Sequence, residues 1–513
     1  MELRVLATRG IGGYRQYRIP SLAVTKSGRI IALYDGRPDF DDLPSPVDVV
    51  MRTSDDNGKT WSEQTILREH HDISGYGDAS LLIDPTIGEH GRILMFCQLT
   101  RVAGFFESVL GIAEDDPMIA HINLSISDDN GKTWSHRLIT DQLKDAKTPG
   151  IFATSGAGTR LTSGRLIQTF VLRRENRLIA AIGYSDDHGE SWHLGAEIID
   201  GNESAAAETS DGTLLIHSRS RPYRLAARSK DGGLTIDEVK PDLALPDPSD
   251  NGSLFRLSDG SLICTHNHDS DLRRNTVIKR SFDNGYTWPD AVILESGSSA
   301  YSTAYELVDG SIGVLFEREG YSEIVFTKVQ LDEFKPAGKI LQGKSEVEFD
   351  VILRNIRSIK PEDIGNQNQR RVPEVDMSIF GSAVRKEVGP AGGNASNEPL
   401  YTTDELDRLL GPVAPGWHLG DEVRWSGKIS NKTEDSLTDI QIRNSFNDEI
   451  LSREELLPGE TWSFLDMREV ITSEDLSKAE LEILFTAKFK AQNKDLVLVQ
   501  RKLYDPNTGL PCS

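Results

Sequence analysis

Three arginines, a tyrosine and a glutamate of this sequence have the chemistry of a site for an acidic substrate. Arg18 stands in the segment YRIPSL, Arg224 in YRLAARS and Arg273 in DLRRNTVIKRS. A guanidinium fork pairs with both oxygens of a carboxylate, so three forks around one point would form a receptor for an anionic group. Tyr301 (SAYSTAYEL) and Glu208 (AAETSDG) add a phenol and a base. A phenol with a reference pKa of ~10 needs such a base to act as a nucleophile at neutral pH.

Two aspartates extend this set. Asp42 lies in the proline-bracketed loop FDDLPSP, and Asp78 lies in YGDASLL. A carboxyl group serves as a general acid when its surroundings raise its pKa, and Asp42 is the candidate for that role. A neutral phenol suits a carboxylate substrate, because an anionic Asp or Glu nucleophile would be repelled by it. The residues therefore predict acid/base chemistry around a nucleophilic tyrosine.

An eight-residue pattern with an aspartate at its third position recurs between Ser54 and Trp288. Complete copies are Ser54–Trp61, Ser127–Trp134, Ser185–Trp192 and Ser281–Trp288, and Ser229–Ile236 is a fifth copy that lacks the tryptophan. Each follows an alternating, strand-like run. We expect the aspartate to accept hydrogen bonds from the backbone of a tight turn, the glycine to supply positive φ, and the tryptophan to pack as an apolar plug.

A second repeat places a glycine turn between two strand-like runs. The glycines are Gly28, Gly91, Gly164, Gly212, Gly260 and Gly310. Together with the aspartate turns, these hairpins define units of about four strands, which is typical of a propeller blade. Residues 1–330 are therefore predicted to form an all-β, six-bladed β-propeller. A solenoid is the alternative, but its repeats are shorter and more even in length.

The blade topology predicts where the reactive residues lie. The start of the first strand and the loop between the second and third strands lie at the same end of a propeller. Four candidates precede the first hairpin of their repeat, and three lie in or just after a second–third loop. The seven are Arg18, Asp78, Glu208, Tyr301, Asp42, Arg224 and Arg273. We expect all of them at the channel mouth, opposite the aspartate turns.

Beyond residue 330 the aspartate turns stop and the pattern changes. Short alternating runs such as EVRWSGKISN and LEILFTAKFKA predict a smaller C-terminal β-sandwich-like domain over 346–513, joined by a linker over 331–345. Its role is predicted to be either that of a carbohydrate-binding module or that of a spacer or dimerisation element.

Composition excludes several classes of protein. With 57 Lys+Arg against 80 Asp+Glu, the net charge of −23 argues against nucleic-acid and anionic-membrane partners. Three widely spaced cysteines exclude a disulfide scaffold, and no metal or cofactor site is predicted. The sequence has no membrane span of ~18 apolar residues. No signal peptide is visible at its start, which predicts a cytoplasmic protein unless a leader was removed.

The sequence resembles the bacterial sialidases (exo-α-neuraminidases). The resemblance covers roughly residues 10–330 and rests on four complete aspartate turns (Asp boxes), on YRLAARS and RRNTVIKRS, and on three shorter motifs. These are RIP at Arg18–Pro20, YDGR at Tyr34–Arg37 and AYST at Ala300–Thr303. It implies hydrolysis of terminal α-linked sialic acid from glycoproteins, glycolipids or oligosaccharides. The mechanism implied is retaining, through a covalent tyrosyl–sialosyl intermediate, since sialidases are the known glycosidases with a tyrosine nucleophile.

The resemblance also implies a role for each residue. Arg18, Arg224 and Arg273 would hold the sialic acid carboxylate, Tyr301 would be the nucleophile, Glu208 its base and Asp42 the acid/base. Asp78 would lie near the sugar's N-acyl or O4 side, Arg37 would contact the O4 region, and Glu317 would orient Arg18. Neighbouring residues compete for three of these roles. They are Arg219 and Arg221 for Arg224, Arg274 for Arg273, and Asp41 for Asp42.

Two further activities fit the same residues. A propeller lectin that binds sialic acid without turnover would not need Tyr301, Glu208 and Asp42, whose presence favours the enzyme. A trans-sialidase would need an acceptor site that the sequence does not identify. Linkage preference and oligomeric state are likewise not encoded in a recognisable motif.

Overall fold

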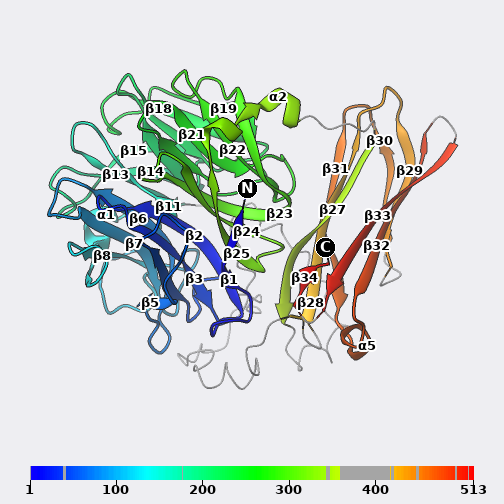
Figure 1. Ribbon diagram of the computed structural model, residues 1–513, viewed down its shortest axis with the longest axis horizontal. Helices are drawn as coiled ribbons and strands as arrows, with labels where there is room; N and C mark the ends of the chain where they lie inside the picture. Colours follow the sequence, from blue (N-terminus) through cyan, green and yellow to red (C-terminus); the bar gives the residue numbers. More distant parts are fainter. Residues whose placement is uncertain are drawn as a thin grey trace.

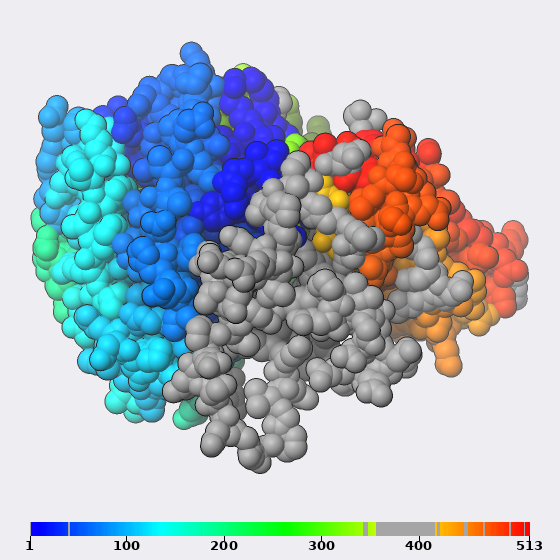
Figure 2. All heavy atoms as spheres, turned by 90° about the horizontal axis from the view of Figure 1, so that it is seen from below, coloured from blue at the N-terminus to red at the C-terminus, as the bar shows by residue number. Residues whose placement is uncertain are grey.

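The structure of the chain is a computed structural model that describes residues 2–38, 42–175, 177–341, 347–358, 416–417, 421–445, 450–491, 494–506 and 508–512. Its regular structure is almost entirely β-strand, as the sequence predicts. The strands form two parts that lie side by side, the first made by the strands within 3–336 and the second by those within 347–511 (Figure 1). Viewed from below, the blue-to-cyan residues of the first part and the orange-to-red residues of the second lie on opposite sides (Figure 2). Within the described residues, no helix has the length and apolar character that a membrane span requires.

Four separate sheets of the first part each contain a run of four neighbouring antiparallel strands. The first has β2 (Gln16–Val24), β3 (Ile30–Arg37), β4 (Asp48–Ser54) and β5 (Thr65–Arg68); the second has β6 (Gly75–Asp84), β7 (Arg92–Thr100), β8 (His121–Ser127) and β9 (Ser135–Leu138). The third has β10 (Gly150–Ala153), β13 (Leu166–Arg174), β14 (Arg177–Ser185) and β15 (His193–Ile199); the fourth has β16 (Ser204–Glu208), β17 (Leu214–Ser218), β18 (Tyr223–Ser229) and β19 (Glu238–Pro246). Two short strands, β11 (Gly156–Ala157) and β12 (Thr159–Arg160), add to the second and third sheets.

A fifth, larger sheet is built around one long strand. Its strands are β20 (Ser253–Arg256), β21 (Leu262–Asn267), β22 (Arg274–Ser281), β23 (Asp290–Glu306), β24 (Ile312–Arg318), β25 (Glu323–Val329) and β1 (Leu3–Thr8), with β26 (Lys335–Pro336) beside β23. The first half of β23 pairs with β22 and its second half pairs with β24. The N-terminal strand β1 pairs with β25, so the two ends of the first part meet in one sheet.

The aspartate turns have the predicted geometry. Asp56 accepts hydrogen bonds from the Thr60 backbone N–H at 2.8 Å and from the Thr60 hydroxyl at 2.6 Å. Gly58 has φ +82° and donates its N–H to Ser54 Oγ at 2.9 Å. The turn at Asp231 keeps the same bonds although it lacks the tryptophan. These hydrogen bonds, and not the tryptophan, therefore fix the turn.

The hydrophobic core of the first part lies between neighbouring sheets. One cluster joins Leu33 of the first sheet to Leu81 and Ile93 of the second. Another joins Leu22 of the first sheet to Leu315 and Phe326 of the β23–β25 region. Each sheet is thus covered by its neighbours, and the first sheet also packs against the last.

Two sheets make up the second part. The smaller contains β27 (Val347–Ser358), β28 (Asp421–Asn431) and β31 (Thr461–Val470). The larger contains β30 (Ile450–Leu456), β29 (Leu437–Asn444), β32 (Leu481–Ala491), β33 (Lys494–Asp505) and β34 (Leu510–Pro511). One hydrophobic cluster takes residues from both sheets, with the Trp425 and Phe485 rings 5.1 Å apart. Strands β27 and β28 lie on the side that faces the first part (Figure 1).

Candidate active site

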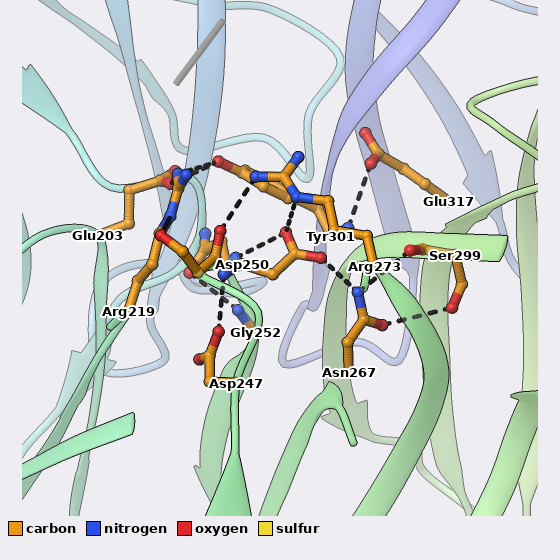
Figure 3. Close-up of polar contacts among 12 residues, drawn as sticks. Glu203, Arg219, Asp247, Asp250, Gly252, Asn267, Arg273, Ser299, Tyr301 and Glu317 are labelled. Carbon is orange, nitrogen blue, oxygen red and sulfur yellow. Dashed lines mark hydrogen bonds and ion pairs between the residues drawn. The ribbon is translucent and has the colours of Figure 1, made fainter. Parts of the chain in front are cut away.

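A buried tyrosine hydroxyl lies between a carboxylate and a guanidinium. Tyr301 on β23 donates its hydroxyl to Glu203 at 2.5 Å and accepts a hydrogen bond from Arg219 Nη1 at 2.8 Å (Figure 3). Arg219 and Glu203 also form an ion pair at 2.5 Å. The proton of the phenol therefore points at a base, and a cation faces the oxygen on which negative charge would develop.

Two further arginines surround the same tyrosine. The guanidinium carbons of Arg18 and Arg273 lie 5.4 and 5.5 Å from the centroid of the Tyr301 ring. A second tyrosine bridges them, because Arg18 lies 4.0 Å from the Tyr321 ring centroid and Arg273 donates to the Tyr321 hydroxyl at 3.1 Å. Three guanidinium groups thus converge on one phenol, in the chemistry that binds a carboxylate.

Glu317 ties this cluster together from β24. Its carboxylate accepts from Arg18 Nε at 2.9 Å and from Arg18 Nη2 at 3.2 Å. It also accepts from the backbone N–H groups of Ile19 and Tyr301 at 2.7 and 3.1 Å. The side chain of Glu317 is fully buried. One carboxylate therefore holds both Arg18 and the backbone that carries Tyr301, so the structure places Glu317 beside Arg18.

The strand pairing is irregular at three of the site residues. The register shifts fall between Arg18 and Ser21 on β2, between Gly77 and Ser80 on β6, and between Ser299 and Ser302 on β23. Arg18, Asp78 and Tyr301 lie at these bulges, and Ile19 and Asp78 have φ of +61° and +58°. Bulges re-aim side chains and are frequent beside active sites, and positive φ outside glycine is strained.

A short loop between β19 and β20 holds two of the arginines. Arg273 Nη2 donates to the Ser249 carbonyl at 3.1 Å, and Arg273 Nε lies 3.8 Å from Asp250. Arg219 Nε donates to Ser249 Oγ at 3.1 Å. Burial raises the pKa of Asp250 to about 6, although Arg273 and Arg219 oppose this. Ser249 and Asp250 therefore fix the directions of two of the three guanidinium groups.

The structure does not bring Glu208 to Tyr301. Glu208 accepts hydrogen bonds from the Thr162 backbone N–H at 2.8 Å and from the Thr162 hydroxyl, and lies 3.9 Å from Arg256. It ends β16, whereas Glu203 precedes that strand. A strand rises ~3.3 Å per residue, which separates these two positions by roughly 16 Å. The expected pairing of Tyr301 with Glu208 is therefore corrected to Tyr301 with Glu203.

The arginine that contacts the Tyr301 hydroxyl is Arg219 and not Arg224, so this expectation is corrected as well. Arg224 Nε pairs with Asp247 at 2.9 Å, and its Nη2 donates to the Asp250 carbonyl at 2.6 Å. The Arg224 and Asp247 side chains are 1% and 0% exposed, so this is a buried ion pair beneath the site.

Three neighbouring residues that compete for the same roles lie elsewhere or cannot be placed. Arg221 pairs with Asp271 at 3.2 Å, and Arg274 pairs with Asp269 at 2.7 Å. Asp41 lies outside the described residues. Arg273 therefore stays the candidate for the third carboxylate-binding arginine, and Asp42 stays the candidate acid/base.

A pairing signal in the sequence places Glu203 and Arg219 opposite each other. The first hairpin of the fourth sheet turns at Asp211–Gly212, and Ser204 pairs with Ser218 across it. Glu203 and Arg219 are the next residues outward on the two strands, and the Arg219 N–H donates to the Glu203 carbonyl at 2.7 Å. Residues at equal distance from a hairpin turn face one another, so a count outward from the glycine turn places them together.

Asp42, Arg37 and Asp78 form the acidic side of the site. Arg37 Nη2 donates to Asp42 at 3.0 Å and to Asp35 at 2.9 Å, and the Asp78 N–H donates to Asp35 at 3.1 Å. The Asp42 carboxylate is one-quarter exposed, whereas Arg37 is buried. Burial and the charges of Asp42 and Asp35 hold the pKa of Asp78 well above its ordinary range. Glu203 acts in the same direction, which ties the acidic side to the tyrosine.

The environment of Tyr301 keeps its phenol protonated at rest. Burial raises the pKa of Tyr301 well above its ordinary value, and Glu203 adds to this, while Arg219 and Arg273 act in the opposite direction. A phenolate therefore does not form spontaneously at neutral pH. The arrangement can deprotonate the phenol only as its oxygen forms a new bond, with Glu203 as the acceptor of the proton.

Comparison with known proteins matches the first part of the chain. The family model for the BNR repeat-like domain matches residues 47–314. The sialidase of Micromonospora viridifaciens is 37% identical over 334 residues, which are 61% of this chain and 51% of that protein. The sialidase of Bacteroides fragilis is 28% identical over 342 residues, 62% of each protein. The chain thus spans about half to three fifths of the length of these curated relatives.

A solved structure matches as well. That of a Hadza microbial sialidase, Hz136, is similar with a TM-score of 0.58 and 28% sequence identity. The match covers 62% of this chain and 66% of that one.

Proposed function

The chain belongs to the BNR repeat-like domain family and is similar to bacterial sialidases, and on this premise we propose that it is an exo-sialidase. Its substrates are glycoproteins, glycolipids and oligosaccharides that end in α-linked sialic acid. It hydrolyses the terminal glycosidic bond with retention of configuration. The observation that carries the proposal is the convergence of three guanidinium groups on the hydrogen-bonded Tyr301–Glu203 pair.

Recognition in this proposal begins with the substrate carboxylate. Sialic acid carries its carboxylate on the anomeric carbon, so the group that is bound adjoins the bond that breaks. Arg18, Arg219 and Arg273 receive this carboxylate. Glu317 holds Arg18 in place with two hydrogen bonds, and the Ser249–Asp250 loop holds the other two arginines. Arg37 and Asp78 lie on the acidic side, where the O4 and N-acyl groups of the sugar bind.

The bond is broken in two steps. The Tyr301 oxygen attacks the anomeric carbon while its proton passes to Glu203, and Asp42 donates a proton to the departing glycosidic oxygen. A tyrosyl–sialosyl ketoside results. Asp42 then takes a proton from water, the water oxygen attacks the anomeric carbon, and Glu203 returns the proton to Tyr301. Arg219 stabilises the negative charge that develops on the tyrosine oxygen in both steps.

For the scaffold, we propose six blades within residues 1–330, a linker over 331–345 and a separate β-sandwich-like domain over 346–513. Six hydrophobic clusters of the described residues support the blades, because each takes residues from two neighbouring four-stranded runs and together they return to the first. In this arrangement β23 is the last strand of the fifth blade and the first of the sixth. The shared cluster of the C-terminal sheets supports the second domain.

An aryl sialoside with a fluorescent leaving group tests the proposed function. Wild-type protein should release the fluorophore and free sialic acid, and Tyr301→Phe should lose several orders of magnitude in kcat. Tyr305→Phe is the matched control, since Tyr305 lies on the same strand and packs against Phe255. Tight binding without turnover in the wild type would instead identify a lectin, and neither binding nor turnover would refute the proposal.

A further inference from the structure

The loop that carries Arg273 is held by a buried carboxylate. Arg273 immediately precedes β22, at the end of the loop that follows Asn267. Asp269 in this loop accepts hydrogen bonds from the backbone N–H groups of Asp271 and Leu272 at 2.9 and 3.1 Å. It also pairs with Arg274 at 2.7 Å. Asp269 therefore contacts residues on both sides of Arg273, through two backbone N–H groups before it and the Arg274 side chain after it.

A lysine from the second part of the chain completes this carboxylate. Lys428 on β28 lies 2.8 and 2.7 Å from the two oxygens of Asp269, with side chains 10% and 2% exposed. Burial alone would raise the pKa of Asp269, but Lys428 and Arg274 outweigh it and lower that pKa below its ordinary value. A buried carboxylate is costly without its partners, so removal of the lysine would leave part of the negative charge of Asp269 unpaired and destabilise the loop.

Strand β27 supports the neighbouring residues in the same way. The Leu353 carbonyl accepts a hydrogen bond from Ser298 Oγ at 2.6 Å, and Ser298 Oγ accepts from the Gly320 N–H at 3.1 Å. Gly320 lies so close to β27 that an added Cβ would meet Leu353 at 2.7 Å. The next residue is Tyr321, which contacts both Arg18 and Arg273.

We propose that the second part of the chain positions residues of the site, with Lys428 as a positioning residue for Arg273. The inference deepens the proposed function and rests on it. Lys428 does not touch the substrate. It fixes Asp269, Asp269 fixes the loop, and the loop sets the direction of the Arg273 guanidinium, while β27 sets the Tyr321 side of the same group. Substrate-carboxylate recognition thus depends on a lysine more than 150 positions beyond the arginine that performs it.

Lys428→Met in the full chain tests this inference. We expect KM for the aryl sialoside to rise about five- to twenty-fold, as when part of a charge-assisted contact is lost, with kcat within about two-fold of wild type. Lys432→Met is the matched control, because Lys432 pairs with Glu348 within the second part and is exposed. The control should keep the wild-type KM. Lys428→Arg, which retains a cation for Asp269, should recover most of the loss.

A double-mutant cycle separates positioning from general stability. If Lys428 acts through Arg273, Lys428→Met should cause no further loss of kcat/KM in an Arg273→Ala background. Equal losses in both backgrounds, or an unchanged KM with only a lowered melting temperature, would overturn the inference. If Lys428→Met does not fold, Asp269→Asn gives the same reading with the loop's backbone acceptor retained. Wild-type protein that neither binds nor cleaves the sialoside would refute the proposed function itself.

Discussion

The hydroxyl of Tyr301 lies 2.5 Å from a carboxylate oxygen of Glu203, 98 residues away in the sequence. The two residues approach from different sheets, one from the bulge in β23 and the other from the residue before β16. Arg219 contacts both groups. The pair can therefore exchange a proton directly, while a fixed positive charge stabilises the oxygen that loses it.

Glu203→Gln should lower kcat for the aryl sialoside by about a hundred- to ten-thousand-fold, because general-base assistance to Tyr301 is lost. The amide keeps the size and a hydrogen-bonding oxygen. Glu208→Gln is the control and should retain wild-type kcat, since Glu208 contacts Thr162 and not the tyrosine. A large loss in Glu208→Gln with normal turnover in Glu203→Gln would show that the base is assigned wrongly.

Arg219→Ala should chiefly weaken ligand binding, whereas Arg224→Ala should chiefly lower the free energy of unfolding. Loss of Arg219 removes a charge-assisted bond worth about 1.5–3 kcal/mol, so calorimetry should show at least about ten-fold weaker binding of a sialic acid analogue. Loss of Arg224 leaves the buried Asp247 carboxylate without its ion-pair partner, which should cost about 3–5 kcal/mol of folding free energy. Urea unfolding measures the second effect. Wild-type stability in Arg224→Ala would contradict the buried position of the Arg224–Asp247 pair.

Asp42→Asn should be selective for the leaving group. An aryl alcohol departs without full protonation, so kcat for an aryl sialoside should fall modestly. An alkyl or sugar leaving group needs the proton, and kcat for sialyllactose should fall about a hundred-fold or more. The ratio of the two kcat values is the measurement. An equal loss on both substrates would remove Asp42 from the acid role.

Asp250 should make stability depend on pH in an unusual direction. Its pKa of about 6 in the folded protein is above the value of an exposed aspartate, so the folded state binds more protons than the unfolded state in this interval. Its contribution to stability is full below pH ~4 and is lost as pH rises through about 6, a difference on the order of 3 kcal/mol.

Urea unfolding between pH 4 and 7 measures this dependence. The slope of the free energy of unfolding against pH should be more negative in the wild type than in Asp250→Asn, which has no proton to lose. Identical slopes in the two proteins would place the pKa of Asp250 near its ordinary value.

The repeats make much of the fold predictable. The aspartate turns are local, because Ser54, Asp56 and Thr60 form the bonds of one turn within seven residues, so their geometry follows from the sequence. Tyr301, Arg18 and Arg273 can be assigned to one end of the sheets because each stands near a strand start or just after a loop. The contacts between β27, β28 and the Arg273 loop are not predictable, since they join segments with no shared pattern.

The sequence does not predict which of two similar residues at the same strand faces the site. Glu208 and Glu203 both lie near β16, and hydrophobic alternation gives no sign of which end faces the site. Arg219 and Arg224 differ in the same way: both adjoin the second–third loop, but only the folded chain shows that Asp247 holds Arg224 below the site. Tyr321 has no sequence signal, because it belongs to a turn in which three successive residues have positive φ and which matches no motif.

The identity of the nucleophile can be tested directly by trapping. A 2,3-difluorinated sialic acid should form a long-lived ketoside with the enzyme, because fluorine beside the anomeric carbon slows the oxocarbenium-like step that would release it. Digestion and mass spectrometry should then find one added sialosyl group per chain on Tyr301, and none in Tyr301→Phe. A label on another residue, or no label in a preparation that is catalytically active, would contradict the account.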